Sequence, residues 1–179
     1  MLGKKMETAL NRQINNEFYS AYIYMSMSAY ATFIGLKGAA NWFTVQSQEE
    51  MVHFNRFYKF MLDRNCKVEL LAVQKPPSEF KSLSDMFEQT LKHEKFITKC
   101  INDLVDLSRK EKDHATEAML QWFVIEQVEE EANPTEILSQ LKLVGKDGNG
   151  LLLVDKDLAT RVFVPPVVGA AAGAAAGAG

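Results

Sequence analysis

Glycine and proline are almost absent from the middle of this chain. No glycine occurs between Gly38 and Gly145, and that interval holds only three prolines. A β-rich domain needs turns far more often and therefore uses both residues more frequently. Long helices satisfy the backbone over such an interval, and we predict an all-α fold.

Length and composition limit the class of protein further. The chain has 179 residues, the size of one ordinary domain, with 47% hydrophobic and 24% charged residues. This balance excludes an intrinsically disordered chain. The formal net charge of −3 offers no basic patch for DNA or RNA, so no nucleic-acid partner is expected.

The chain also lacks the signals of a membrane or secreted protein. The uncharged stretches 18–36 and 162–179 are too polar or too rich in alanine and glycine to span a bilayer. No apolar leader opens the sequence. Cys66 and Cys100 form no zinc-type spacing and suit a reducing compartment. We therefore expect a cytoplasmic protein without a membrane partner.

Capping and helix-breaking residues predict four long helices and a short fifth one. Ser82 with Asp85 resembles a capping box, and Asp113 is suited to be the N-cap of the fourth helix. Leu151, Leu152, Val154 and Leu158 give the fifth helix an apolar side. The expected helix bounds are about 4–34, 39–65, 82–110, 113–144 and 150–163.

The connections predict the topology. Tight turns make helices one and two antiparallel, and likewise three and four. Helix two is roughly 40 Å long at ~1.5 Å per residue. The linker of about 16 residues before helix three can extend to ~53 Å, so it can return along the bundle. The prediction is a four-helix bundle with one long crossover between helices two and three.

Residues 1–163 are accordingly expected to form one domain. Residues 164–179 are a low-complexity tail of proline, alanine and glycine. Such a segment has nothing to pack, so we interpret it as a disordered tail or an artificial linker.

Each of the four apolar stripes is interrupted near its middle by a polar residue. In the first hairpin, the glutamate of the first helix is followed 33 and 36 residues later by two polar residues, and the second hairpin repeats both spacings with an offset of 77. At ~1.5 Å per residue, all six positions fall within roughly 8 Å along the bundle. They are Glu17, Glu50, His53, Glu94, Gln127 and Glu130.

Four carboxylates at one level of a core require compensation, because burying an unpaired carboxylate costs several kcal/mol. No lysine or arginine lies on these stripes. Two divalent cations would cancel the four negative charges, and carboxylate oxygens with one imidazole suit iron, manganese or zinc. A glutamate with Glu-x-x-His is the arrangement of di-iron bundles.

These segments resemble the non-haem ferritins of bacteria and archaea, over about residues 1–163. The resemblance is carried by LNRQINNEFYSAY at 10–22, QEEMVH at 48–53 and LQWFVIEQVEEE at 120–131, with Glu94 at the family's third-helix ligand position. It implies a ferritin-like di-iron domain with a ferroxidase centre. Glu17 and His53 would bind the first iron, with Glu50 bridging to the second, which Glu94 and Glu130 would bind.

The resemblance implies further site residues. Gln127 would lie near the oxygen-binding side, and Gln127-x-x-Glu130 replaces the second Glu-x-x-His of bacterioferritins, so the second iron would have oxygen ligands only. Tyr24 and Trp122 match family aromatics that are candidate electron donors, although core packing is the alternative for both. A third iron site would use Glu49, Glu126, Glu129 and Glu130.

The implied function is iron storage and detoxification. Two Fe(II) ions would be oxidised by O₂ or H₂O₂, and the ferric product would be stored in a cage of identical chains, 24 in this family, with the fifth helix at a subunit contact. Met51 lies where bacterioferritins have a haem-ligating methionine. Because non-haem ferritins also carry methionine there, no haem is expected.

Two alternatives stay open. One is a soluble di-iron peroxidase or oxygenase that does not store iron, and the other is an engineered cage with impaired ferroxidase activity. A mini-ferritin that protects nucleic acid fits less well, because those proteins place their ligands at a subunit interface.

Pro134 is unusual within the predicted fourth helix. It removes the amide that would bond the carbonyl of Glu130, and its ring crowds that carbonyl. We therefore expect helix four to bend or break here and to loosen the second and third iron sites.

Overall fold

The structure is a computed structural model that describes residues 2–145 and 147–165. These residues form five α-helices and no strand, which confirms the all-α prediction. None of the described helices combines the length and the apolar character that crossing a lipid bilayer requires. The helices are α1 (Lys4–Phe33), α2 (Lys37–Asp63), α3 (Leu83–Glu111), α4 (His114–Val144) and α5 (Gly148–Leu158).

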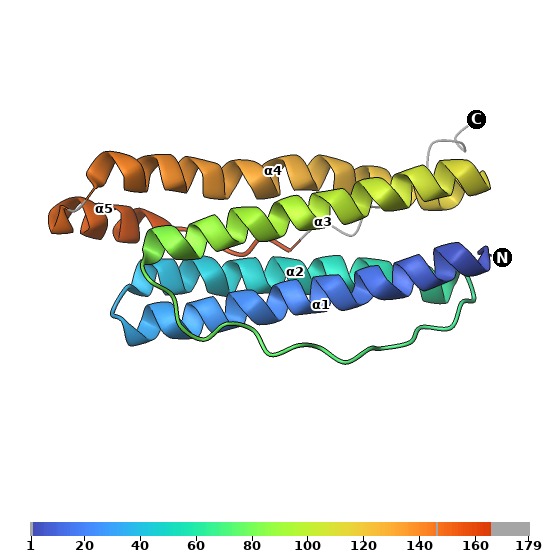
Figure 1. Cartoon of the computed structure of the whole chain (residues 1–179), viewed down its shortest axis with the longest axis horizontal. Helices are drawn as coiled ribbons and strands as arrows, with labels where there is room; N and C mark the ends of the chain where they lie inside the picture. The colour runs from blue at the N-terminus through green and yellow to red at the C-terminus, as the bar shows by residue number, and fades with distance from the viewer. Residues whose placement is uncertain (1, 146, 166–179) are drawn as a thin grey trace, which may run out of the picture.

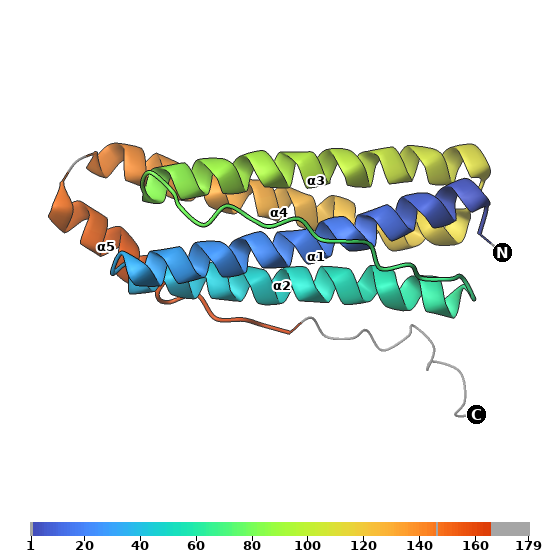
Figure 2. The same ribbon diagram turned by 60° about the horizontal axis from the view of Figure 1, so that its bottom comes forward.

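The four long helices form a bundle of two antiparallel hairpins. Helices α1 and α2 pack together, as do α3 and α4, and α1 also packs against α3 (Figure 1). The crossover between α2 and α3 runs along α1 for most of its length, as Figures 1 and 2 both show. The Ser26 hydroxyl donates to the Pro77 carbonyl at 2.6 Å and the Tyr30 hydroxyl donates to that of Phe80 at 2.6 Å. The predicted long crossover is confirmed.

Side-chain caps define where α3 and α4 begin. The Ser82 hydroxyl accepts from the Asp85 amide at 3.1 Å. The Asp113 carboxylate accepts from the Thr116 amide at 3.3 Å. Both bonds satisfy amides that have no partner within their helix. The two caps predicted from the sequence are therefore present.

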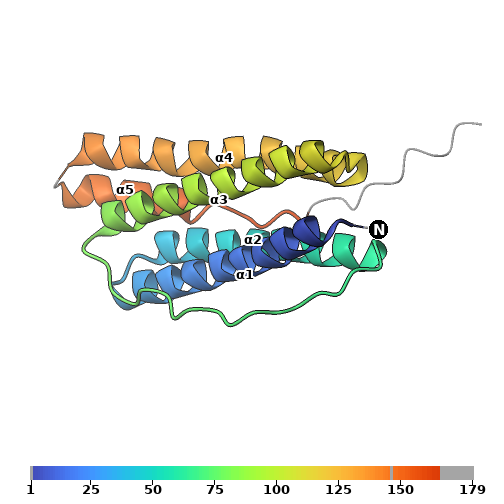
Figure 3. The ribbon, with the colours of Figure 1, turned by 45° about the vertical axis from the view of Figure 1, so that its right-hand side comes forward.

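Helix α2 receives its cap from a distant part of the chain. Its own N-cap, Leu36, makes no side-chain cap bond. Instead, the Asp155 carboxylate of α5 accepts from the Ala39 amide at 2.8 Å. A Cβ atom on Gly38 would lie 1.5 Å from the Asp155 carbonyl oxygen, so only glycine allows α5 this close. This contact fixes α5 against the start of α2 (Figure 3).

The fifth helix is shorter than predicted. It ends at Leu158, and residues 159–165 continue without helical structure to Pro165. Beyond Leu158, the carbonyl oxygens of Ala159 and Arg161 accept from the Asn41 side chain of α2 and not from amides of a continued helix. Val154 and Leu158 are buried as predicted, whereas Leu152 is 56% exposed. Leu152 lies on the outer side of α5, and the subunit contact expected for this helix stays a prediction. Residues 166–179, most of the predicted tail, lie outside the described residues.

The core consists of two apolar clusters, one toward each end of the bundle. One cluster includes Met27, Phe43 and Phe87. The other includes Leu10 and Phe57, together with further residues of α3 and α4. The six polar residues singled out in the sequence fall between these clusters along every helix. Each helix therefore changes from apolar to polar and back to apolar along its buried face.

Pro134 does not break α4. The helix is continuous from His114 to Val144, and Pro134 is one of its buried residues. The predicted break is wrong because Ile137 and Leu141, beyond the proline, are buried in an apolar cluster with α1, α2 and α3. Burial of these two side chains offsets the lost backbone bond and keeps the next turns helical.

Replacing Gly38 with alanine tests the docking of α5. Alanine favours a helix by about 1 kcal/mol over glycine, yet the new Cβ would push Asp155 away. We expect Gly38→Ala to lower the melting temperature by several degrees and to speed amide exchange in α5. Gly148→Ala is the matched control, because no atom lies within 4 Å of its added Cβ. Equal behaviour of the two variants would contradict this account.

Replacing Pro134 with alanine restores an amide for the Glu130 carbonyl. We expect this variant to be more stable than wild type by about 1–3 kcal/mol, up to the cost of a proline in a helix interior. Thermal unfolding of the metal-free protein measures the effect. Pro77→Ala, in the exposed crossover, provides a control that should gain nothing. An unchanged or lower melting temperature for Pro134→Ala would show that the proline does not destabilise α4.

Candidate metal centre

The six residues predicted from the doubled spacing meet at mid-height of the bundle. Glu17 comes from α1, Glu50 and His53 from α2, Glu94 from α3, and Gln127 and Glu130 from α4. None of these six residues is more than 5% exposed. Because they follow apolar residues at helical spacing, the packing that buries each stripe also buries its polar member. The helices thus deliver all six side chains to one buried level.

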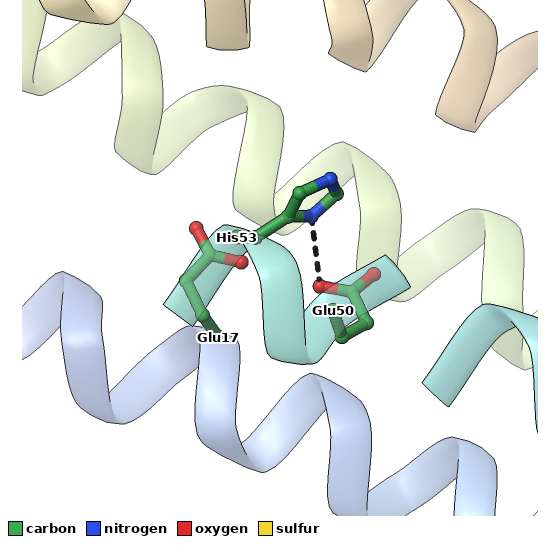
Figure 4. Close-up of side chains that lie close together, drawn as sticks. All are labelled: Glu17, Glu50 and His53. Atoms are coloured by element: carbon green, nitrogen blue, oxygen red, sulfur yellow. Dashed lines mark hydrogen bonds and ion pairs between the residues drawn. The ribbon is translucent and has the colours of Figure 1, made fainter. Parts of the chain in front are cut away.

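The ligand atoms form two trios that share one carboxylate. Atoms of Glu17, Glu50 and His53 lie within 4.8 Å of one another, and so do atoms of Glu50, Glu94 and Glu130. Figure 4 shows the first trio, with the Glu17 carboxylate and the His53 ring approaching Glu50. Glu50 belongs to both groups. The arrangement offers two adjacent cation positions with Glu50 between them.

Glutamine side chains orient the carboxylates on both sides of the centre. The Gln13 amide donates to Glu17 Oε1 at 2.7 Å, and the Gln46 amide donates to Glu130 Oε2 at 2.5 Å. Glu17 Oε2 is buried without a hydrogen-bond partner among the described residues. An unpaired buried carboxylate oxygen costs free energy, and a bound cation would satisfy it. The donor set fits a metal ion.

His53 lies between two carboxylates. Its Nδ1 atom is 3.2 Å from Glu50 Oε2, and its Nε2 atom is 3.9 Å from Glu126 Oε1. Burial lowers the pKa of His53, but attraction to Glu50 and the bonds to Glu126 and Glu50 raise the pKa well above its usual value. In the absence of metal, the imidazole is therefore held as a cation that partly compensates the carboxylates.

Three carboxyl groups of this level, those of Glu17, Glu94 and Glu130, resist ionisation. Burial, followed by repulsion from Glu50, raises the pKa of Glu17 to about 8, and the same two causes raise the pKa of Glu130 to about 8. Burial with repulsion from Glu50 and Glu130 raises the pKa of Glu94 well above its usual value. Cations bound among these groups would favour their charged forms. The centre is thus built for exchange of protons against metal ions.

The residues of the predicted third site are only partly brought together. Glu126 and Glu130 form a group with His53, with ligand atoms within 4.8 Å. Glu49 instead forms an ion pair with Arg161. Glu129 is exposed and lines the same surface groove as Glu49 and Glu126. The described residues therefore place an acidic groove beside the two buried trios.

Both aromatic residues singled out in the sequence adjoin the centre. The hydroxyl of Tyr24 donates to Glu94 Oε1, and its ring is fully buried. Burial and the neighbouring Glu94 raise the pKa of Tyr24, so it remains a hydrogen-bond donor. Trp122 meets the His53 ring edge-on at 5.5 Å, and the guanidinium of Arg56 lies 4.0 Å from the centre of the Trp122 ring.

Sequence reasoning missed three residues that support the centre. Gln13 is the hydrogen-bond partner of Glu17 and lies four residues before it, a spacing that could have indicated the contact. Gln46 lies on the apolar stripe of α2, four residues before Glu50, and the same spacing could have indicated its contact with that carboxylate. No spacing in the sequence indicated a role for Arg161, because this residue contacts Gln46 from the segment after α5.

Comparison with known proteins identifies the family of the chain. Residues 7–144 match the family model described as a ferritin-like domain. The chain is 43% identical to a bacterial non-heme ferritin of Campylobacter jejuni over 156 residues, 87% of this chain and 93% of the relative. It is 39% identical to one of Staphylococcus aureus over 163 residues, 91% of this chain and 98% of the relative.

Solved structures give the same result. The structure reported as a novel open-pore ferritin from the archaeon Archaeoglobus fulgidus superposes with a TM-score of 0.89 at 48% identity, covering 90% of this chain and all of that one. A closed form of that ferritin, engineered by mutagenesis, superposes with a TM-score of 0.90 at 48% identity and covers 92% of this chain. The family match over residues 7–144, the identity to the curated relatives and the superposition of the fold lead to one conclusion: the chain belongs to the ferritin family.

Proposed function

We propose that this protein stores and detoxifies iron, by oxidising Fe(II) at the buried centre and holding the ferric product in a cage of identical chains. The observation that carries the proposal is the pair of ligand trios sharing Glu50. The ferritin relatives support it at the level of the family. Iron is the substrate of the reaction, and the residues of the centre bind it transiently.

Each residue has a role in this proposal. Glu17 and His53 hold the first Fe(II), and Glu94 and Glu130 hold the second, with Glu50 bridging. Neutral His53 is required for binding, so arrival of the metal displaces the imidazolium proton. Gln127 donates to the Glu94 carbonyl oxygen at 3.3 Å and to the Thr98 hydroxyl at 3.2 Å, which keeps its amide beside the second position.

The proposed redox step transfers two electrons. Two Fe(II) ions and O₂ with two protons give two Fe(III) ions and H₂O₂; with H₂O₂ and two protons as oxidant, the second product is two molecules of water. Tyr24, whose hydroxyl donates a hydrogen bond to Glu94, is proposed as an additional electron donor. With one Fe(II) ion and one proton, the Tyr24 phenol would reduce H₂O₂ to two molecules of water and leave Fe(III) and a tyrosyl radical. Arg56 above Trp122 disfavours loss of an electron there, because a second positive charge would develop beside the guanidinium.

Storage requires a container, which we propose is built from 24 copies of the chain. Apolar side chains remain exposed on α1 and the crossover, including Phe18, Tyr22, Leu70 and Leu71. Another copy packing on these residues would bury them. Both cysteines, Cys66 and Cys100, are free thiols, which agrees with the reducing cytoplasm as the compartment.

Iron stoichiometry tests the proposal. Metal-free protein receives rising Fe(II) in air, with a protein-free control, and the soluble iron retained per chain is measured. We expect retention far above the two or three ions that the ligand groups can hold. A plateau at two or three ions would contradict storage and favour a soluble di-iron enzyme.

Replacing the bridging carboxylate tests the centre itself. We expect Glu50→Gln to slow initial Fe(II) oxidation by at least about tenfold. Glu88→Gln, on the exposed face of α3, is the matched control.

The raised pKa values predict how the metal-free protein responds to pH. Glu17 and Glu130 have a pKa of about 8 in the folded state against 4.5 ordinarily, so between these values the folded state binds more protons than the unfolded state. Stability therefore falls as pH rises through this window, and His53 adds to the trend. We expect a melting temperature several degrees lower at pH 8 than at pH 5.5, and Zn²⁺ should remove most of the difference.

The double variant Glu17→Gln with Glu130→Gln is the control for this pH dependence. It keeps the shape of both side chains and removes their titration, so its melting temperature should change less between the two pH values. A metal-free wild-type protein that melts higher at pH 8 would be incompatible with the raised pKa values.

A further inference from the structure

The segment after α5 lies along the bundle beside the metal centre. We name residues 159–165 the C-terminal strap; in Figures 1 and 2 it runs back from α5 along α2. The Asn41 amide of α2 donates to the carbonyl oxygens of Leu158 at 3.4 Å, Ala159 at 3.3 Å and Arg161 at 2.9 Å. One side chain of α2 therefore anchors the start of the strap.

Arg161 connects the strap to the residues around the centre. Its guanidinium carbon lies 4.3 Å from the centre of the Trp42 ring. Nη1 donates to Gln46 Oε1 at 2.8 Å, and Nη2 donates to Glu49 Oε2. The Arg161 side chain is only 19% exposed. Three partners on α2 thus hold the planar guanidinium in one orientation.

The bond to Arg161 fixes the direction of the Gln46 amide. Since Gln46 Oε1 accepts from Arg161, its Nε2 faces the carboxylates and donates to Glu130 Oε2 at 2.5 Å and to Glu50 Oε1 at 3.4 Å. An amide without this constraint can present either end. Arg161 thereby engages Glu49 directly and Glu130 through Gln46.

The surface groove next to the centre has a strongly acidic lining. Its volume is about 550 Å³, and Arg161 is the only cationic side chain among its lining residues in the described chain. The acidic residues that line it are Glu49, Glu126, Glu129, Glu136 and Asp157. A smaller adjoining cavity is lined by His53 and Glu126 together with Phe163 and Val164 of the strap. Residues of the strap therefore line both the groove and the cavity beside His53.

We propose that Arg161 is a positioning residue that closes a third cation position while the strap is docked. It neutralises Glu49 and, through Gln46, commits one oxygen of Glu130, so these two carboxylates cannot join Glu126 and Glu129 around an ion. Release of Arg161 opens the position. This inference rests on the proposed function, because it assumes that the two buried trios bind metal.

Zn²⁺ titration of the metal-free assembled protein, followed by calorimetry, tests the inference without any redox step. We expect wild type to bind two ions per chain and Arg161→Ala to bind three. Asn41→Ala, which releases the strap without changing a charge, should also bind a third ion. Lys156→Ala is the matched control: it removes one exposed positive charge from α5, and it should bind two ions.

Rescue by lysine distinguishes this role from a purely structural one. Arg161→Lys retains a positive charge next to Glu49, so we expect its third ion to bind at least about tenfold more weakly than that of Arg161→Ala. Two ions in both Arg161→Ala and Asn41→Ala, or three ions in wild type, would overturn the inference and leave the proposed function intact. A wild-type protein that binds no Zn²⁺ at the trios would overturn the proposed function itself.

Discussion

The structure depends on the electrostatic cost of burying four carboxylates at one level of a helical core. Glu17, Glu50, Glu94 and Glu130 are all nearly inaccessible to water, and repulsion through Glu50 adds to the cost of burial. Protons, the His53 imidazolium and glutamine donors compensate this cost in the metal-free chain. Metal ions would compensate it better, because they would satisfy both the charge and the oxygen that lacks a hydrogen-bond partner among the described residues. Metal binding would then be coupled to the stability of the folded state.

The fold supplies the packing that makes this cost tolerable. Two apolar clusters hold the ends of the four long helices together, so the polar residues between them have no freedom to turn toward solvent. The same packing keeps α4 helical through Pro134. Local rules that would break a helix or expose a carboxylate are overridden here by the burial of neighbouring side chains. The centre is a property of the whole bundle and of no single helix.

Helix boundaries and the six central residues could be predicted from the sequence, because both depend on local spacing. Ser82 and Asp113 mark helix caps, and the repeated spacings of 33 and 36 residues place the candidate ligands at one height. The contacts of the C-terminal part could not be predicted. Asp155 caps α2, and Arg161 reaches Gln46, across more than 110 residues of sequence. Such contacts follow from how α5 docks, which no periodicity encodes.

The position of the polar level between two apolar clusters also decides how fraying of the helices affects the centre. Helical bundles open most readily at their ends, since terminal turns have the fewest contacts. Here an apolar cluster separates the polar level from each end of the bundle. A terminal turn can therefore open while the six central side chains stay buried and keep their relative positions.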